Sequence, residues 1–128
     1  MSLNAYQRAR SIVESPRATE FRLMSQITGD MMHARDSGLA GAALVAVLHR
    51  NREVWSVFSS ACGAAGNELP AELRASIISI ALWVDRYTSD VMAGRETIEA
   101  LIEVNRSITE GLSPGMQQVR VVRPAEAA

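Results

Sequence analysis

The sequence predicts an all-α protein, a compact single-domain helical bundle of about five helices with a flexible C-terminal tail. Three observations support this fold class. The chain has 128 residues, of which 48% are hydrophobic, and this suffices for one domain with its own core. Apolar residues recur every three or four positions, which is the period of an amphipathic helix. Glycine and proline divide this pattern into segments, and only the tail shows the alternation typical of a strand.

The first two predicted helices meet at Ser15-Pro16, where serine can cap a helix and proline can occupy its first position. The first helix, Leu3 to Glu14, has only a thin apolar face. It is therefore a candidate lid that docks loosely and can move aside. The second helix runs from about Pro16 to Arg35, and Gly38 ends the connection that follows it. Its apolar stripe consists of Phe21, Met24, Ile27, Met31 and Ala34.

The third predicted helix, about Leu39 to Cys62, has an apolar stripe that only Asn51 interrupts. Gly63 and Gly66 stop this helix, and a turn leads into a fourth helix from Pro70 to about Met92. Three residues widen the apolar surface of the fourth helix: Ile78, Leu82 and Trp83. We therefore expect the fourth helix to be the most central one.

The last predicted helix runs from about Arg95 to Glu110 and carries Asn105 on its apolar stripe. From Ser113 onward the sequence shows no helix signal. The predicted organisation is thus one helical domain over residues 1–112 and a flexible tail over residues 113–128.

Composition excludes several classes of partner. Thirteen arginines and no lysine balance fourteen acidic residues to a net charge of −1, so nucleic acid is not an expected partner. The longest uncharged apolar stretches, Gly38–Leu48 and Ala75–Val84, are shorter than the roughly 18–20 residues that span a bilayer, so membrane insertion is not expected. A single cysteine and no apolar leader segment predict a cytoplasmic location.

No residue pattern predicts catalysis, a cofactor or a metal site. His33, His49 and Cys62 are far apart in the sequence and lack ligand spacing. Cys62 is expected to be a small buried apolar residue late in the third helix. The chain is therefore not predicted to be an enzyme.

Two asparagines and two tryptophans on the apolar stripes leave alternatives open. Asn51 and Asn105 either bond to each other or to a backbone group and set the packing register, or line a groove that receives an incoming helix. Trp55 and Trp83 are expected in the core, whereas a partly exposed tryptophan would anchor a partner.

Several segments together resemble the FlaF family of alphaproteobacterial flagellar biosynthesis proteins. The resemblance covers about 105 of the 128 residues, and its order and spacing are specific although no single piece is diagnostic. In Ser59 to Ala65 the chain departs from the family, whose members tend to carry an acidic residue there. The segments that carry the resemblance are Asn4-Ala5-Tyr6, Ser15 to Glu20, Asn51 to Trp55, Gly66 to Pro70, Leu73-Arg74, Ile77 to Val84 and Leu101 to Leu112.

This resemblance implies a small cytoplasmic helical protein without enzyme activity that is needed for flagellin synthesis and secretion. Flagellin is the implied partner, and the translational regulator FlbT is a second. The first hypothesis is an export chaperone or adaptor whose groove shelters an amphipathic terminal helix of flagellin. The alternative is a regulatory interaction protein that acts with FlbT on flagellin translation. The sequence leaves the choice between monomer and homodimer open.

The chaperone hypothesis assigns partner contacts to residues on these stripes and at the helix ends. The expected apolar contacts are Phe21, Met24, Trp55 and Trp83. The expected polar contacts are Arg17, Glu20, Asn51, Arg74 and Asn105.

Overall fold

The computed structural model describes residues 16–64, 66 and 69–112, and within these ranges every regular element is a helix. The chain is therefore all-α, as predicted. The helices are α2 (Pro16–Asp36), α3 (Gly41–Gly63), α4 (Ala71–Met92) and α5 (Glu99–Leu112). The predicted first helix, Leu3 to Glu14, and the predicted tail, 113–128, lie outside the described residues.

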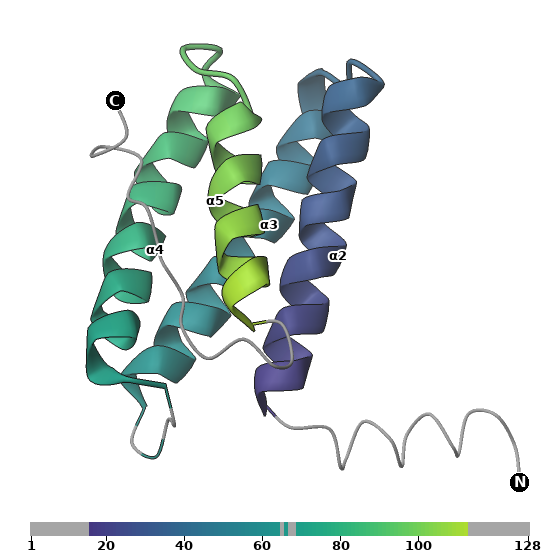
Figure 1. Cartoon of the computed structure of the whole chain (residues 1–128). Helices are drawn as coiled ribbons and strands as arrows, with labels where there is room; N and C mark the ends of the chain where they lie inside the picture. Colours follow the sequence, from purple (N-terminus) through teal and green to yellow (C-terminus); the bar gives the residue numbers. More distant parts are fainter. Residues whose placement is uncertain (1–15, 65, 67–68, 113–128) are drawn as a thin grey trace, which may run out of the picture.

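The four helices form a bundle in which each helix runs antiparallel to the one before it (Figure 1). Helix α3 packs along both α4 and α2, and α2 also packs along α5, whereas α4 approaches α5 over a short stretch only. The expectation that the fourth helix is the most central one is therefore wrong. Among the described helices, α4 packs extensively against α3 only. Part of its wide apolar surface therefore faces outward.

Two of the connections begin with the same helix-ending motif. At the end of α2, Gly38 has φ +65°, the Leu39 N–H donates to the Ala34 carbonyl over 2.9 Å, and the Gly38 N–H donates to the Arg35 carbonyl over 3.2 Å. After α4, Gly94 has φ +77° and the same pair of bonds closes the helix. This bond pattern is the Schellman motif, which favours glycine at the left-handed position. The local sequence thus fixes where both helices end.

The last helix starts four residues later than the sequence predicts, at Glu99 instead of Arg95. The intervening residues make other contacts. The Arg95 guanidinium pairs with Asp90 at 2.8 Å, and the Tyr87 hydroxyl donates to the Thr97 carbonyl over 3.1 Å. These contacts to α4 hold residues 95–98 as a connection outside the helix.

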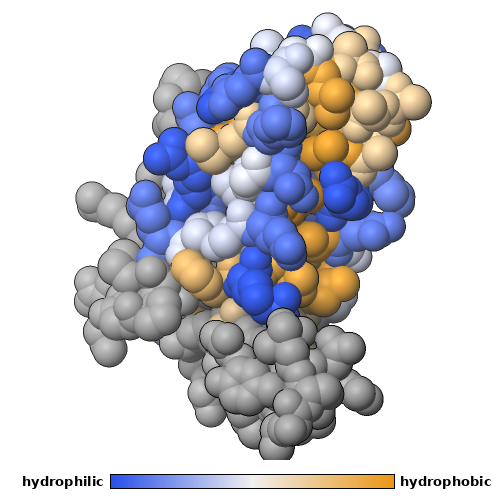
Figure 2. Space-filling view, turned by 90° about the vertical axis from the view of Figure 1, so that its right-hand side faces the viewer, coloured by the Kyte–Doolittle hydropathy of each residue, from blue (hydrophilic) through white to orange (hydrophobic). Residues whose placement is uncertain are grey.

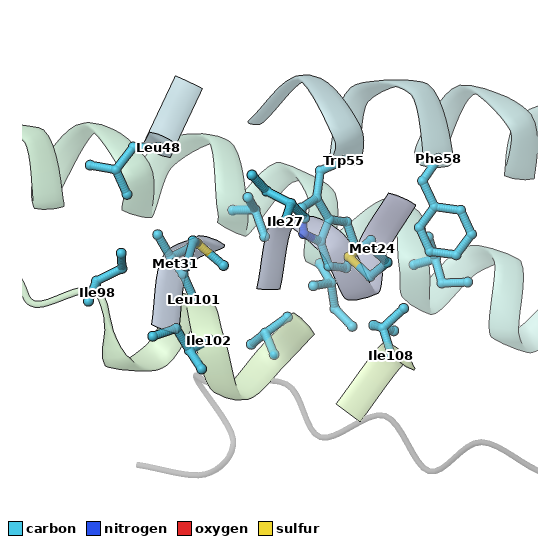
Figure 3. Packing of buried hydrophobic residues seen from close by; sticks show 14 of the residues in the cluster. Met24, Ile27, Met31, Leu48, Trp55, Phe58, Ile98, Leu101, Ile102 and Ile108 are labelled. Carbon is cyan, nitrogen blue, oxygen red and sulfur yellow. The ribbon is translucent and has the colours of Figure 1, made fainter. Parts of the chain in front are cut away.

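The core lies between the four helices, and its largest member is Trp55, which is 1% exposed. The rings of Trp55 and Phe58 are tilted against each other with centroids 5.9 Å apart. Figure 3 shows these two α3 side chains pointing inward, toward the layer that holds Met24. Two buried threonines are satisfied locally, since the hydroxyls of Thr28 and Thr88 each donate to the carbonyl four residues earlier over 2.6 Å.

Candidate functional site

A chain of three hydrogen-bonded polar side chains crosses the interior from α3 to α5. The Nε1–H of Trp55 donates to Oδ1 of Asn105 over 2.8 Å, and Nδ2 of Asn105 donates to Oδ1 of Asn51 over 2.8 Å. Both asparagines are 0% exposed. A buried polar group left unpaired costs about 1–3 kcal/mol, so a shift of α5 along α3 would be unfavourable. The three side chains, called the polar seam below, therefore set the register of α5.

The polar seam shows the first of the two arrangements that the sequence leaves open for the asparagines. They satisfy each other, as the first alternative predicts. The seam is not fully satisfied, because Nδ2 of Asn51 is buried without a hydrogen-bond partner among the described residues. Contact between these asparagines and a partner stays a prediction, and it would require the bundle to open.

The outward side of α3 differs from this interior. Between α3 and α4 lies a groove of about 370 Å³, called the α3/α4 groove, with the side chains of Ser56, Ile78 and Leu82 in its walls. Leu82 is 64% exposed and Ile78 is 38% exposed. Trp55 also lines the groove, although it is 1% exposed. The groove therefore presents apolar surface directly above the buried tryptophan.

The charged groups of the α3/α4 groove are paired with one another. Arg52 Nη2 donates to the Asp85 carbonyl over 2.7 Å and to Ser89 Oγ over 2.8 Å. Arg52 Nε lies 3.1 Å from Asp85 Oδ1, close enough for an ion pair, but its N–H does not point at that oxygen. His49 Nε2 lies 2.8 Å from Glu53 Oε1. Among the described residues, the part of this groove that lacks a matching partner is therefore its apolar surface.

A second groove, of about 440 Å³, lies on the other side of α3 and is called the α2/α3 groove. Leu23 and Ile27 line it from α2, and Val54 and Val57 line it from α3. Val57 is 65% exposed. Figure 2 looks onto the side of the molecule where α2 lies and shows hydrophobic surface gathered toward α3, interrupted by hydrophilic residues. Helix α3 thus separates two grooves that each contain an exposed aliphatic side chain.

Comparison with protein families adds a decisive observation. The family model described as flagellar protein FlaF matches residues 2–112. The chain belongs to the FlaF family. This is a flagellar protein family and not an enzyme family. No curated protein and no solved structure matches the chain.

The residues predicted to contact a partner occupy three different environments in this FlaF-family chain. Met24, Asn51, Trp55 and Asn105 are at most 1% exposed. Glu20, Phe21, Arg74 and Trp83 are half-buried, and the side chain of Arg17 lies outside the described residues. The structure does not gather these residues into one surface, and Trp55 alone among those described lines the α3/α4 groove. Their contact with a partner remains a prediction.

Glu20 and Arg74 both influence the pKa of the Cys62 thiol. Burial raises the pKa of the Cys62 thiol to about 11, Glu20 adds to this rise and Arg74 opposes it. The Arg74 Nε–H also donates to the Leu69 carbonyl over 3.1 Å, which ties α4 to the connection before it. Cys62 is 1% exposed, which confirms its expected role as a small buried residue.

Trp83 has a different environment from Trp55. It is half-buried against the core and stacks on Tyr87, with ring centroids 4.6 Å apart. Burial, followed by the nearby Glu96 carboxylate, raises the pKa of the Tyr87 hydroxyl. Core packing is confirmed for Trp55, whereas Trp83 packs on the core and remains partly accessible.

The exposed aliphatic residues are the part of the candidate site that sequence reasoning missed. Ile78, Leu82 and Val57 lie off the buried stripe of their helices. The widened apolar surface of the fourth helix is the sequence signal for two of them, Ile78 and Leu82, and the prediction above assigns that surface to burial. Read as excess apolar area beyond what one neighbouring helix covers, the same pattern indicates an exposed groove.

No described helix is both long enough and apolar enough to cross a bilayer. Within residues 16–64, 66 and 69–112, no three His, Cys, Asp or Glu side chains are grouped as metal ligands would be.

Proposed function

We propose that this FlaF-family protein binds flagellin in the cytoplasm and promotes its synthesis and secretion as an export chaperone or adaptor. The binding site in this proposal is the α3/α4 groove. The occupant is an amphipathic terminal helix of a flagellin monomer, which exposes an apolar stripe before assembly. Family membership supports a flagellar role, and the groove supplies a surface of suitable chemistry.

The observation that carries the proposal is the exposure of Leu82 and Ile78 beside a groove whose charged residues are already paired. Leu82 is 64% exposed and lies one helical turn from Ile78. Helix recognition commonly uses apolar anchors spaced three or four residues apart, set into a groove between helices. An incoming apolar stripe would cover both side chains without displacing the Arg52–Asp85 ion pair.

The binding experiment mixes the full-length chain with monomeric flagellin and measures the mass of the complex by size-exclusion chromatography with light scattering. Flagellin without its terminal helices is run in parallel. A complex with intact flagellin alone supports the proposal. If the truncated flagellin binds equally well, the groove does not recognise those helices and the proposal fails.

A matched pair of variants then locates the site. Leu82→Asp places a charge in the α3/α4 groove and is expected to weaken flagellin binding about 30-fold, the effect of losing one apolar anchor of about 2 kcal/mol. Val57→Asp changes an equally exposed aliphatic residue in the other groove and is expected to leave binding unchanged. The reverse result would move the site to the α2/α3 groove.

Binding to FlbT is the outcome that would favour the regulatory alternative. A stoichiometric complex with purified FlbT, together with no flagellin complex at micromolar concentrations, would replace the chaperone proposal with regulation of flagellin translation. The Leu82→Asp variant would then be tested against FlbT in the same way.

A further inference from the structure

We infer that the outward face of α3 is a self-association surface, on which a second copy of this chain packs in the antiparallel direction. The face lies between the two grooves, on the side of α3 that points away from Asn51. Its six residues, called the outer stripe below, are all exposed: Ala42, Ala46, His49, Glu53, Ser56 and Ser60. The occupant proposed for this surface is therefore the same surface of another molecule.

The spacing of the outer stripe is that of a coiled-coil seam. Its members follow one another in alternating steps of four and three residues, which keeps them on one line along a helix. From residue 42 to residue 60 this line extends about 27 Å, or about five helical turns. Helices α2 and α4 pack along α3 but leave the line exposed. A second helix can therefore lie against α3 over most of its length.

The small residues of the outer stripe are distributed symmetrically about position 51. Ala42 and Ser60 lie nine positions on either side of it, and Ala46 and Ser56 lie five positions on either side. In an antiparallel pair with its two-fold axis at that position, each residue comes level with its counterpart in the other copy. Alanine then faces serine at four levels. Such small side chains let two α3 helices approach to the short end of the usual range of about 8–10 Å between helix axes.

The charged residues at the centre of the stripe are complementary in the same arrangement. His49 and Glu53 lie two positions on either side of position 51, so each meets the other type in the second copy. Arg50, whose Nη1 lies 3.8 Å from Asp30 Oδ2 in its own chain, is within one residue of the level of that carboxylate. A parallel pairing would place Glu53 beside Glu53, and like charges that face each other are unfavourable. Charge complementarity therefore favours a second copy in the antiparallel direction.

An exposed aliphatic side chain borders the outer stripe. Val45, one helical turn before His49, is 41% exposed. A second α3 at this short distance covers part of it and removes apolar surface from water. One pair of helices buries less surface than the standard interface of about 1,600 Å², so we expect a dissociation constant in the micromolar range.

The inference does not rest on the proposed function. Three members of the stripe, His49, Glu53 and Ser56, also line the α3/α4 groove. The test variants therefore leave unchanged the two apolar anchors proposed for flagellin, Ile78 and Leu82. All the experiments use the full-length chain without flagellin, so their failure leaves the proposed function untouched.

The first experiment measures the mass of the full-length chain by sedimentation equilibrium at concentrations from about 1 to about 300 μM. The average mass is expected to rise from that of one chain to that of two. A mass of one chain at every concentration would overturn the inference. A mass that continues to rise beyond two chains would also overturn it, because a two-fold interface closes on itself.

Charge reversal tests the centre of the stripe. Glu53→Arg places a cation opposite His49 and Arg50 of the second copy, and it is expected to weaken dimerisation about 10-fold or more. Glu103→Arg makes the same change at an exposed position of α5 and is the matched control. Circular dichroism of both variants checks that the helices are retained. Equal effects of the two variants would place the interface elsewhere and contradict the inference.

Rescue by the opposite charge distinguishes a direct contact from a structural effect. The double variant His49→Glu, Arg50→Glu has an acidic stripe and is expected to stay monomeric at concentrations where the unmodified chain is a dimer. Mixed with Glu53→Arg, it is expected to form a one-to-one heterodimer, because acidic positions then face basic ones. A mixture in which both variants stay monomeric would overturn the inference.

Two cysteine variants test the direction and the register of the pair. Ala42→Cys and Ser60→Cys are each made in a Cys62→Ala background, so that each chain has one thiol. Under mild oxidation, the mixture of both variants is expected to form a disulfide between chains, because positions 42 and 60 come level across the interface. Either variant alone is expected to remain uncrosslinked. Crosslinking of one variant with itself in preference to the mixture would indicate a parallel pair and overturn the inference.

Discussion

The inward and outward sides of α3 each carry an exception to the usual distribution of polarity, a polar side chain inside and an apolar one outside. Inside, Asn51 is 0% exposed and bonds to Asn105 on another helix. Outside, Val57 is 65% exposed, and the neighbouring α4 leaves Leu82 64% exposed. A polar group inside weakens packing unless one register satisfies it, and an apolar group outside gains nothing until something covers it. The difference indicates that the interior fixes the packing register of the helices, whereas the exterior retains apolar surface that a binding partner can cover.

The largest loss of stability is expected on the inward side of α3, from Trp55→Ala, which removes the largest core side chain. The cavity and lost contacts should cost about 3–5 kcal/mol in the free energy of unfolding, and Asn105 Oδ1 would lose its donor. Urea unfolding followed by circular dichroism measures this. Because the variant can unfold, Trp55→Phe is measured beside it, and a loss below about 1 kcal/mol for both would show that the interior tolerates change.

The next largest effect is expected from the asparagines, and their order tests the polar seam. Asn105→Ala leaves both Trp55 Nε1 and Asn51 Oδ1 unpaired, at about 1–3 kcal/mol for each group. Asn51→Ala leaves one group of Asn105 unpaired and also removes a donor that already lacks a partner. Asn105→Ala should therefore be the less stable variant in urea unfolding. Equal losses, or the opposite order, would mean that the two bonds do not hold the register.

A smaller change in the free energy of unfolding is expected when the pH is raised. The folded chain holds the pKa of Cys62 at about 11, above the value of 9.0 expected for an unfolded thiol. The folded state therefore retains its proton more strongly, so this contribution to stability is full below pH 9 and is lost as the pH rises through 11. Tyr87, with its raised pKa, acts in the same direction. Unfolding measured at pH 7.5 and 10.5 should show less loss in Cys62→Ala than in the unmodified chain, and identical losses would contradict the assignment.

The smallest effect on stability is expected outside. Leu82→Asp and Val57→Asp should each change the free energy of unfolding by no more than about 0.5 kcal/mol, because their side chains are largely exposed. Thermal unfolding of both variants in parallel checks this, and a large loss for Leu82→Asp would mean that it belongs to the core.

Much of the helical structure could be predicted because local chemistry determines it. Glycines 38 and 94 end their helices through bonds within six residues, so their neighbours in sequence suffice. The start of α5 could not be predicted, because Tyr87 and Asp90 on another helix hold residues 95–98 outside it. Among the candidate site residues, the periodicity placed Asn51 and Asn105 on apolar stripes, but only their approach across the bundle paired them.

By itself, the sequence determined the helical class, the ends of α2 and α4 and the apolar stripes that form the core, because propensity and periodicity act over a few residues. The tertiary structure decided that α3 is central, that Trp55 bonds to Asn105, and that Leu82 and Val57 remain outside. Those outcomes depend on how many neighbours each helix acquires. A stripe of apolar residues indicates that a helix surface can be buried. Only the packing of the bundle decides which part of that surface is buried.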